Sequence, residues 1–538
     1  MIKKLTQALL ALTLVGGMTA CDKSMKGVDE GTTSATGDTY ISVAFSTANP
    51  NSTRAEDANF NSIGEYIGRD KVEDVNIYMI NPIDESIEVK KFVNNNNTTN
   101  PNIVANADNN ANTNDFRTEA WKTTPGKKIV YVYVNIAGTA IETALDGAHD
   151  KASFEAANKA AYALVENGAV KEDFAKYDGT KKEDVIAMNT VAHETLDVKA
   201  GVKKAEAEAA TGAKNRVSVK VRRLVAQAAV TSSEATYEIK ENFKGAETTL
   251  ASLSDLKWDV MQYEQKTYLM PQPIDPAANP AQNALSVEFC KSPNFAFIPA
   301  DATPNLYSEA KDKYAYRAFT GEVVKTFTRA HVNETDVAAI VATPMKFITE
   351  TTHQLGGKLE DAADPKTGYR KGNTTYVIVS AKITPKAWGE GQESKAGDDL
   401  YFGVKDHKFY KELEAAKTAN KVDAVRESDQ LNAPDNVIKY AGGRCYYVAW
   451  LNPNNQGETE SKEPIVSPIL RNNIYHVNIS AIKKLGYSGN PFNPNGDDPK
   501  DPDDKTPDPK ETLYPVDTYM AVEISVVNWG VHSYDQEF

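Results

Sequence analysis

Cys21 is the first residue of this 538-residue chain whose type and position point to a chemical reaction. It follows two lysines and a short apolar stretch, Leu5 to Val15, which is shorter than the roughly 20 residues needed to span a bilayer. Small residues directly before a cysteine are typical of a bacterial lipoprotein signal, in which the chain is cut before the cysteine and the thiol then carries lipid. We therefore predict a signal peptide over 1–20 and lipidation of Cys21. An ordinary secretory signal with an incidental cysteine is the alternative.

Arg54 is the first arginine in the chain, and it lies in a loop, 49–57, that is rich in Pro, Asn, Ser and Asp. Such residues form exposed turns, and exposed loops are where proteolytic cleavage concentrates. An arginine-specific protease would meet its first site between Arg54 and Ala55. An unremarkable surface arginine is the alternative explanation.

No pattern of residues indicates catalysis. The seven histidines are scattered, and none lies in an HExxH or GxSxG frame. Acidic pairs at 497–498 and 503–504 lack the glycine turn and the terminal Glu of an EF-hand calcium loop. We expect no enzyme, no catalytic residue, no cofactor and no metal site.

Charge and cysteine content narrow the remaining classes. The formal net charge is −14 without a notable Lys/Arg-rich patch, so we do not expect nucleic acid as a partner, because its phosphates require cationic groups. Beyond Cys21 the chain has only Cys290 and Cys445, which could pair in an oxidising compartment or remain two buried thiols.

Strand patterns dominate the rest of the chain, which is long enough for two or more domains. Alternating or β-branched runs predict strands at 72–80, 128–134, 216–230, 375–383, 445–451 and 474–482. Apolar residues at helical spacing predict a helix at 151–166, and 203–210 and 409–418 are shorter candidate helices. Many short strands with few helices indicate a mainly β protein, built from β-sandwiches with helical insertions.

The two ends of the chain each carry a strand with one apolar face. The C-terminal strand, 519–527, follows a spacer rich in Pro and Asp, and its apolar positions are Met520, Val522, Ile524 and Val526. The N-terminal strand, 40–45, has the same period at Ile41, Val43 and Phe45. The C-terminal strand therefore either completes its own sheet or is offered to another molecule.

A family resemblance is carried by segments at both ends and in most of the C-terminal half. These are Cys21, 40–45, Arg54-Ala55, 63–66, 70–80, 370–377, 446–453, 471–477 and 518–534. Together they resemble the fimbrillins, which are the type V pilus subunits of Bacteroidia, and in particular the minor, Mfa-type fimbrillins. Residues 85–215 match only loosely.

The resemblance implies two tandem transthyretin-like β-sandwich domains and a C-terminal donor strand. The expected organisation is a signal peptide (1–20), a propeptide with a placeholder strand (21–54), an N-terminal sandwich (55–232), a C-terminal sandwich (233–487), a Pro/Asp-rich spacer (488–512) and the donor strand (513–538).

The resemblance also implies a route of assembly. The precursor reaches the outer membrane as a lipoprotein, and an arginine-specific cysteine protease cuts it after Arg54. The cut releases residues 21–54, and the C-terminal strand of another copy fills the groove that strand 40–45 leaves. The expected partners are copies of the same chain in a head-to-tail filament, anchor and tip accessory subunits, the protease, and outer-membrane lipid before processing.

The behaviour of an incomplete sheet agrees with this route. A missing strand leaves unpaired backbone groups and an open core, and a head-to-tail contact that does not close makes filaments. Ile41, Val43 and Phe45 would then be placeholders for Val522, Ile524 and Val526. We expect a pilus shaft subunit in cell-surface fimbriae that supports adhesion and biofilm formation. The alternative is a fimbrial tip or accessory adhesin, or a ligand-binding surface lipoprotein.

Overall fold

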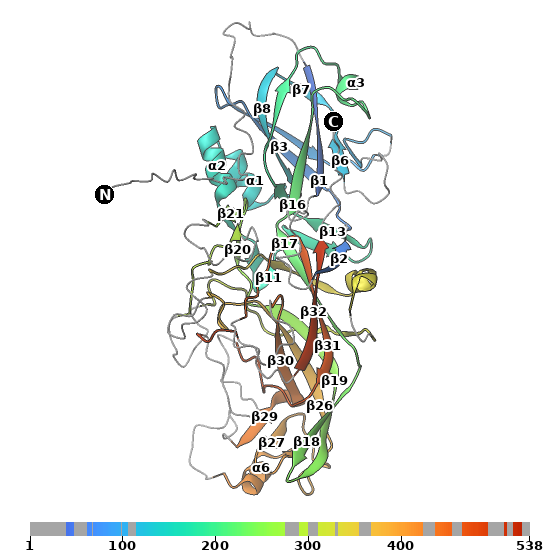
Figure 1. Ribbon diagram of the computed structural model, residues 1–538, viewed down its shortest axis with the longest axis vertical. Coiled ribbons are helices and arrows are strands. Elements are labelled where there is room, and N and C mark those ends of the chain that lie inside the picture. Colours follow the sequence, from blue (N-terminus) through green and yellow to red (C-terminus); the bar gives the residue numbers. More distant parts are fainter. Residues whose placement is uncertain are drawn as a thin grey trace, which may run out of the picture.

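The computed structural model describes residues 39–47, 62–66, 68–97, 99–105, 115–274, 290–299, 310–328, 332–354, 367–422, 436–453, 465–492, 510–513 and 520–529. Cys21, Arg54 and Ala55 lie outside these residues. The described part of the molecule is mainly β and elongated, with one strand-rich body above the other in Figure 1.

The upper body is one ten-stranded sheet curled into a barrel-like sandwich. Its order is β4-β3-β8-β14-β16-β1-β6-β5, with β15 paired to β8 and β7 paired to β1. The strands are β1 (Thr39–Thr47), β3 (Asp74–Ile80), β4 (Ile87–Val93), β5 (Ile103–Ala105), β6 (Asp115–Thr118), β7 (Trp121–Thr123), β8 (Gly126–Val134), β14 (Met188–Thr190), β15 (Glu194–Val198) and β16 (Arg216–Arg223). β-Branched and aromatic side chains from most of these strands meet in one core inside the curl.

The lower body is a sandwich of two facing sheets. The first has the order β2-β32-β31-β17-β24 with β25 on β17, and the second has the order β18-β19-β26-β30 with β23 on β19. The first contains β2 (Ser62–Tyr66), β17 (Val225–Ser232), β24 (Lys325–Thr326), β25 (Met345–Thr349), β31 (Asn473–Ile482) and β32 (Met520–Trp529). The second contains β18 (Tyr237–Phe243), β19 (Ala246–Met261), β23 (Glu322–Val323), β26 (Tyr376–Pro385) and β30 (Arg444–Trp450). Side chains from both sheets share one core.

Smaller elements decorate the two bodies. They are the strand pairs β10 (Val165–Glu166) with β11 (Ala169–Val170), β12 (Ala175–Asp178) with β13 (Glu183–Ile186), β9 (Ala161–Ala163) with β20 (Lys266–Tyr268) and β21 (Gln272–Pro273) with β22 (Cys290–Lys291), and the sheet β28 (Lys408–Tyr410), β27 (Leu400–Gly403), β29 (Val437–Tyr440). The helices are α1 (Ala140–Asp146), α2 (Lys151–Lys159), α3 (Lys204–Ala207), α5 (Val337–Val341) and α6 (Leu413–Asn420), with single 3₁₀ turns at Glu334–Asp336 and Ala441–Gly443. No helix among the described residues is long and apolar enough to cross a membrane.

Helix α2 is shorter than the helix predicted over 151–166. Asp150 caps its N-terminus by accepting a hydrogen bond from the Ser153 backbone N–H, and the helix ends at Lys159 because Ala160 is extended. The next residues form β9, which pairs with β20. Tertiary pairing therefore overrides the helical propensity of the Ala-rich segment here.

The single strand predicted over 216–230 is two strands that belong to different bodies. β16 lies in the upper sheet and β17 in the lower one, and the chain changes sheet at Leu224, whose backbone N–H donates to Ala187 O at 2.9 Å. The change of sheet therefore comes before residue 232, where the predicted N-terminal domain ends. The pattern of apolar residues continues across it, because Leu224 and Val225 are both buried in the core between the bodies.

Buried ion pairs fasten the junction between the two bodies. Arg223 pairs with Asp70, both side chains are fully buried, and the Arg223 backbone N–H donates to Asn472 Oδ1 at 3.1 Å. Beside them Arg69 Nε lies 2.8 Å from Asp184 Oδ2. Arg223, at the end of β16, is thus held both to the stretch between β2 and β3 and to Asn472, next to β31 of the lower body.

Candidate functional site

The first strand, β1, lies in the interior of the upper sheet rather than at an edge (Figure 1). It runs parallel to β16 on one side, with Ser42 opposite Arg216 and Thr47 opposite Val221. On its other side it pairs antiparallel with β7 and then with β6. Removing β1 would therefore expose unpaired backbone groups on β16 on one side and on β6 and β7 on the other.

One face of β1 fills the core of the upper body. Ile41 and Val43 are fully buried and Phe45 is nearly so, and the Phe45 ring stacks on Phe116 at 5.4 Å between centroids. These are the three residues predicted for the placeholder strand, and they pack against Val217, Val219 and the other core residues of the sheet. Burying each such side chain contributes roughly 1.5–3 kcal/mol.

The N-terminal end of β1 is fixed by a buried hydroxyl. Thr39 Oγ1 donates to the Lys199 carbonyl at 2.7 Å and accepts from the Val202 backbone N–H and from Asn215 Nδ2, each at 3.1 Å. Asn215 Nδ2 also donates to the Tyr40 and Lys199 carbonyls. We call the Lys199, Val202 and Asn215 groups the threonine pocket. It accepts a small hydroxyl side chain at one position only, so it sets the register of the strand.

The outer face of β1 is covered in part by α3. The Ser42 hydroxyl is fully buried there, donates to Ala207 O at 2.7 Å and accepts from Arg216 Nε at 3.0 Å. Two positions further, Ala44 is only half-buried and lies opposite Arg117 of β6. The outer face is thus closed at position 42 and open at position 44.

The C-terminal end of β1 contains a defect. The Thr47 side chain is 3% exposed, yet its Oγ1 has no hydrogen-bond partner among the residues that the structure describes. A buried hydroxyl without a partner costs about 1–3 kcal/mol. The placeholder strand is therefore not an optimal occupant of its own groove.

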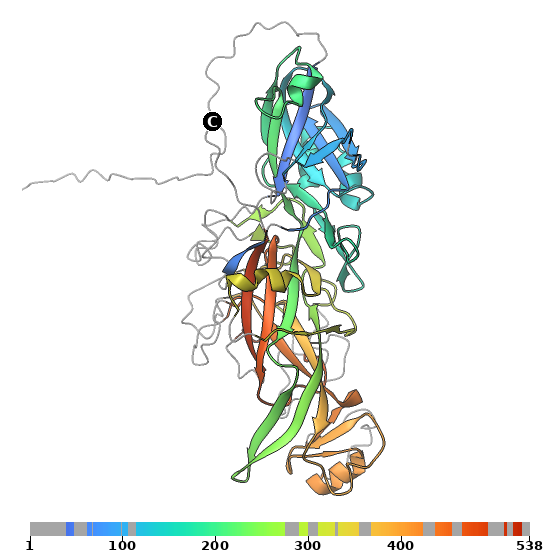
Figure 2. The same cartoon turned by 90° about the vertical axis from the view of Figure 1, so that its right-hand side faces the viewer.

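The last strand, β32, is paired within its own chain. It lies between β31, to which it is antiparallel, and β2, to which it is parallel (Figure 2). The register places Val522 opposite Ile479, Ile524 opposite Val477 and Val526 opposite Tyr475. These three residues of β31 are buried in the lower core. Met520 is also buried in that core. The single chain thus adopts the arrangement in which the C-terminal strand completes its own sheet.

β2 covers the outer side of β32 and connects it to the predicted cleavage site. It begins at Ser62, a few residues after Arg54, and pairs with Val526 to Trp529. β1 and β2 flank Arg54 in sequence but belong to different bodies. A cut at Arg54 would therefore separate β1 covalently from everything that follows it.

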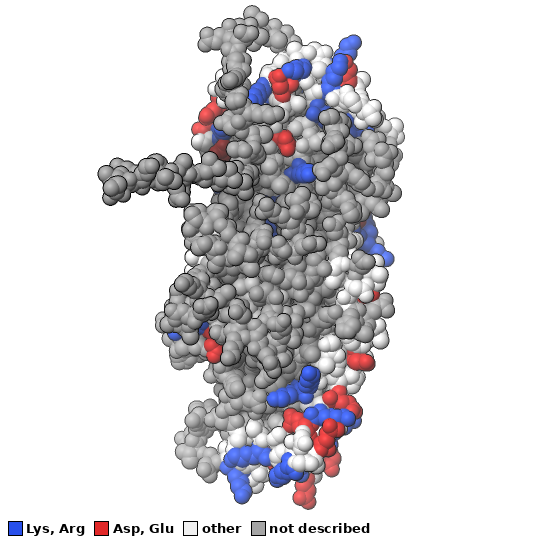
Figure 3. Space-filling model, viewed as in Figure 1, with Lys and Arg blue, Asp and Glu red and all other residues white. Residues whose placement is uncertain are grey.

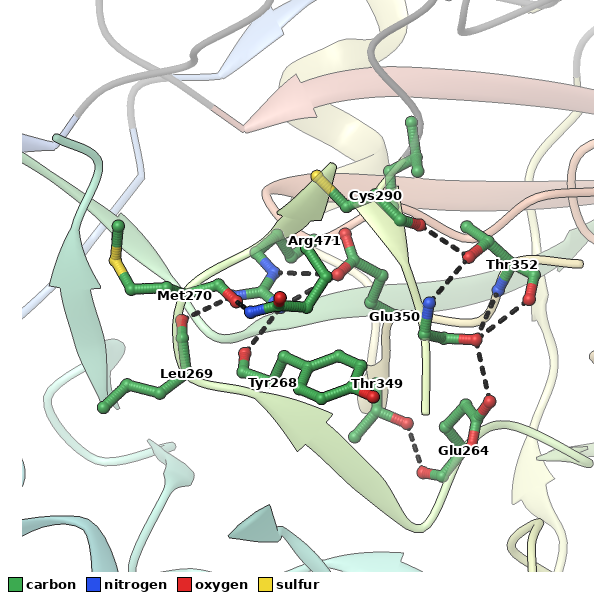
Figure 4. A network of polar contacts seen from close by, with 12 residues as sticks. Glu264, Tyr268, Leu269, Met270, Cys290, Thr349, Glu350, Thr352 and Arg471 are labelled. Atoms are coloured by element: carbon green, nitrogen blue, oxygen red, sulfur yellow. Dashed lines mark hydrogen bonds and ion pairs between the residues drawn. The ribbon is translucent and has the colours of Figure 1, made fainter. Parts of the chain in front are cut away.

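A buried polar network lies in the lower body and was not predicted from the sequence (Figure 4). Glu264 Oε1 accepts from Ser292 Oγ at 2.7 Å and from the Asn294 backbone N–H, while burial raises the pKa of Glu264 to about 7. Close by, Arg471 Nη2 lies 2.8 Å from Glu350 Oε2 and donates to the Tyr268 carbonyl. These polar groups bind one another and backbone groups inside the protein, which indicates a structural network that holds loops to the sandwich.

No signal in the sequence marks these network residues, because they are single polar residues far apart in the chain. The two remaining thiols are also placed: Cys445 is fully buried in the lower core, where burial raises its pKa, and Cys290 lies in β22. They are not joined by a disulfide. Within the described ranges no group of three or more His, Cys, Asp or Glu is placed to hold a metal ion.

Charged side chains of both signs are mixed on the described surface shown in Figure 3, most visibly at the lower end. Many of them form exposed pairs, such as Lys417 with Glu414 at 2.9 Å and Lys439 with Asp399 at 2.9 Å. Such pairs contribute little to stability. The candidate functional site is therefore the pair of end strands, β1 and β32, and not a charged patch on the described surface.

Comparison with known proteins gives consistent matches. A family model described as the C-terminal part of fimbrillin, the major fimbrial subunit protein type IV, matches residues 438–535. The chain is 33% identical over 556 residues to the minor fimbrium subunit Mfa1 of Porphyromonas gingivalis, with 99% of each chain covered. Among solved structures it is similar to the fimbrilin FimA of P. gingivalis, with a TM-score of 0.40, 12% identity and coverage of 92% of this chain and 99% of the other. It is also similar to the tip fimbrial protein Mfa3 of P. gingivalis, with a TM-score of 0.34, 10% identity and coverage of 91% and 100%.

Proposed function

This chain belongs to the fimbrillin family, and from that premise we propose that it is the repeating shaft subunit of a pilus that polymerises by protease-triggered strand exchange. As a fimbrial subunit it belongs to cell-surface fimbriae and assembles with other fimbrial subunits. This role is structural and requires no catalytic side chain.

The observation that carries the proposal is the position of β1. This strand is interior to its sheet, its core face is buried, and the predicted cut at Arg54 falls between it and the rest of the chain. After the cut, β1 stays only by non-covalent contacts. Its departure would open a groove between β16 on one side and β6 and β7 on the other, which is unfavourable until another strand fills it.

The C-terminal strand of a second copy is the proposed occupant. To be donated, β32 must leave β31 and β2 of its own chain. It then regains a ladder on both sides and an apolar core in the acceptor, so the exchange replaces contacts of a similar kind. The open groove of the cut acceptor supplies the driving force, because a filled groove is more stable than an empty one.

The processing steps complete the proposal. The precursor is exported to the outer membrane with lipid on Cys21, and an arginine-specific protease then cuts between Arg54 and Ala55. Anchor and tip accessory subunits end the filament, and the filament supports adhesion and biofilm formation.

A second function is favoured by one observation, the self-pairing of β32. A subunit whose last strand stays in its own sheet can receive a strand without donating one. Such a chain would be a fimbrial tip or accessory adhesin, or a ligand-binding surface lipoprotein.

The test uses three forms of the full chain: unchanged, Arg54→Ala and, as a control that keeps the charge, Arg54→Lys. Each is treated with an arginine-specific protease and run without boiling on a denaturing gel. The proposal predicts a ladder of SDS-resistant polymers whose N-terminus is Ala55, from the unchanged chain only. If cleavage at Arg54 is complete and only monomers result, the shaft assignment fails and the second function stands.

A further inference from the structure

The two end strands share more than an apolar period. Asp38–Thr47 reads Asp-Thr-Tyr-Ile-Ser-Val-Ala-Phe-Ser-Thr, and Asp517–Val526 reads Asp-Thr-Tyr-Met-Ala-Val-Glu-Ile-Ser-Val. The two segments are identical at the starting Asp-Thr-Tyr, at Val43 and Val522, and at Ser46 and Ser525. Thr39–Thr47 is β1, so the groove in the upper body fixes what each of these positions requires.

We propose that Thr518–Val526 of one copy replaces Thr39–Thr47 of the next, residue for residue and in the same direction, parallel to β16. This register rests on the proposed strand exchange and specifies it. It places Met520, Val522 and Ile524 where Ile41, Val43 and Phe45 lie. It therefore differs by two residues from the pairing expected from the apolar period alone, in which Val522 takes the place of Ile41.

The threonine pocket supports this register. Thr39 is fully buried there and its hydroxyl makes three hydrogen bonds, so the pocket requires a small side chain that both donates and accepts. Thr518 provides the same group. The register shifted by two would place Met520 in the pocket, where its thioether could not donate to the Lys199 carbonyl.

The outer face also distinguishes the two registers. In the proposed one, Ala521 takes the closed position of Ser42 under α3, and Glu523 takes the open position of Ala44 opposite Arg117. The shifted register would instead force Glu523 into the closed position, where Ser42 is fully buried against Ala207. Burying a carboxylate under a helix is far less favourable than placing it at a half-buried site beside a guanidinium.

The far end of the groove explains why the donor can replace the placeholder. Thr47 buries a hydroxyl that has no partner among the described residues, and in this register Val526 takes its place. Valine has nearly the shape of threonine without the hydroxyl, so the defect disappears. The donor strand lacks the Ser42 hydroxyl contacts and the stacking of Phe45 on Phe116. In return it buries no unpaired hydroxyl at the position of Thr47, and it places a carboxylate beside Arg117.

Cysteine pairs test the register directly. Ser218 and Lys220 of β16 are exposed and lie opposite Ala44 and Ser46. The pairs Ser218→Cys with Glu523→Cys, and Lys220→Cys with Ser525→Cys, are each introduced in one chain. After cleavage and polymerisation the samples are oxidised and boiled in SDS without reductant. Both pairs should give covalent ladders, whereas Ser218→Cys with Ser525→Cys, the pair expected for the shifted register, should not.

The outcomes separate the register from the exchange itself. Non-covalent polymers that cross-link only through Ser218→Cys with Ser525→Cys, or through neither proposed pair, overturn the register while strand exchange stands. A chain with no added cysteine that fails to polymerise after cleavage overturns the exchange. Chains without added cysteines also measure background from Cys290 and Cys445.

Substitutions in the donor give an independent readout. Thr518→Val should raise the monomer left at equilibrium about tenfold, because it leaves buried hydrogen-bonding groups of the threonine pocket unpaired; a tenfold change corresponds to about 1.4 kcal/mol. Thr518→Ser keeps the hydroxyl and should polymerise nearly as the unchanged chain does. Equal polymer yields from Thr518→Val and the unchanged chain would contradict the assignment of Thr518 to the pocket.

Discussion

The same substitution at the two ends of β1 is expected to have opposite effects. Thr39→Val removes a hydroxyl with three partners, and Thr47→Val removes one with none among the described residues. Both changes replace an oxygen with a methyl group of similar size in a buried site. The difference between them therefore isolates the hydrogen bonds from packing.

The magnitudes follow from the groups that lose a partner. In Thr39→Val the Val202 backbone N–H is left buried and unpaired, whereas Asn215 Nδ2 keeps two carbonyl acceptors. One unpaired buried group costs about 1–3 kcal/mol, so the free energy of unfolding of the upper body should fall by that amount. Thr47→Val should raise it by about 1–3 kcal/mol, because it removes a buried hydroxyl that has no partner among the described residues. Thr39→Ser, the matched control, should lose only the methyl contribution of about 0.8 kcal/mol.

Hydrogen exchange measured by mass spectrometry suits this comparison, because it reports opening of β1 and β16 separately from the lower body. Uncut precursor with Cys21→Ser avoids lipid. Faster exchange in β1 for Thr39→Val, with slower exchange for Thr47→Val, is the expected result. Equal acceleration by both substitutions would show that the Thr39 hydrogen bonds do not fix the strand and that the threonine pocket does not set its register.

Three further predictions concern buried ionisable groups. Burial raises the pKa of Glu264 to about 7, so the folded chain keeps a proton that the unfolded chain loses above about 4.5. Stability should therefore fall by roughly 3 kcal/mol as the pH rises from about 4.5 to about 7, and Glu264→Gln should flatten that slope in urea titrations. Burial lowers the pKa of His476 to about 3, so the unfolded chain binds a proton first, below about 6.5. Stability should fall as the pH drops from about 6.5 toward 3, and His476→Gln should weaken this acid sensitivity in thermal melts. Asp70→Asn leaves Arg223 without its ion pair and should cost about 3–5 kcal/mol, seen as faster proteolysis between the two bodies, while adding Arg223→Met should recover part of the loss.

The strands with the strongest patterns were predicted well from the sequence. Segments 128–134, 375–383, 445–451 and 474–482 correspond to β8, β26, β30 and β31, because dense β-branched and aromatic runs fit strands buried in a sandwich. The mainly β architecture follows from them.

Features that depend on distant contacts could not be predicted. No local sequence signal marks Leu224 as the point where the chain changes sheet. The position of this point depends on the preceding residue, Arg223, which is held by Asp70 and Asn472, and both of these are far away in sequence. β2 is too short to show a clear alternating pattern in the sequence, and it contains Gly64, which weakens a strand. Its strand conformation therefore depends on pairing with β32. The placeholder residues Ile41, Val43 and Phe45 lie on the buried face that the period predicts, but the threonine pocket comes from Lys199, Val202 and Asn215 and was visible only in three dimensions.

The most direct test of strand exchange uses two chains that can each do only half of it. An acceptor lacks residues 514–538 and is cut after Arg54, and a donor carries Arg54→Ala on an otherwise full chain. Mixed, they should form one-to-one heterodimers and nothing longer, because the donor's own groove is still occupied by β1. The same acceptor left uncut is the control and should not bind. Heterodimers that form without cleavage, or no complex after cleavage, would contradict the account.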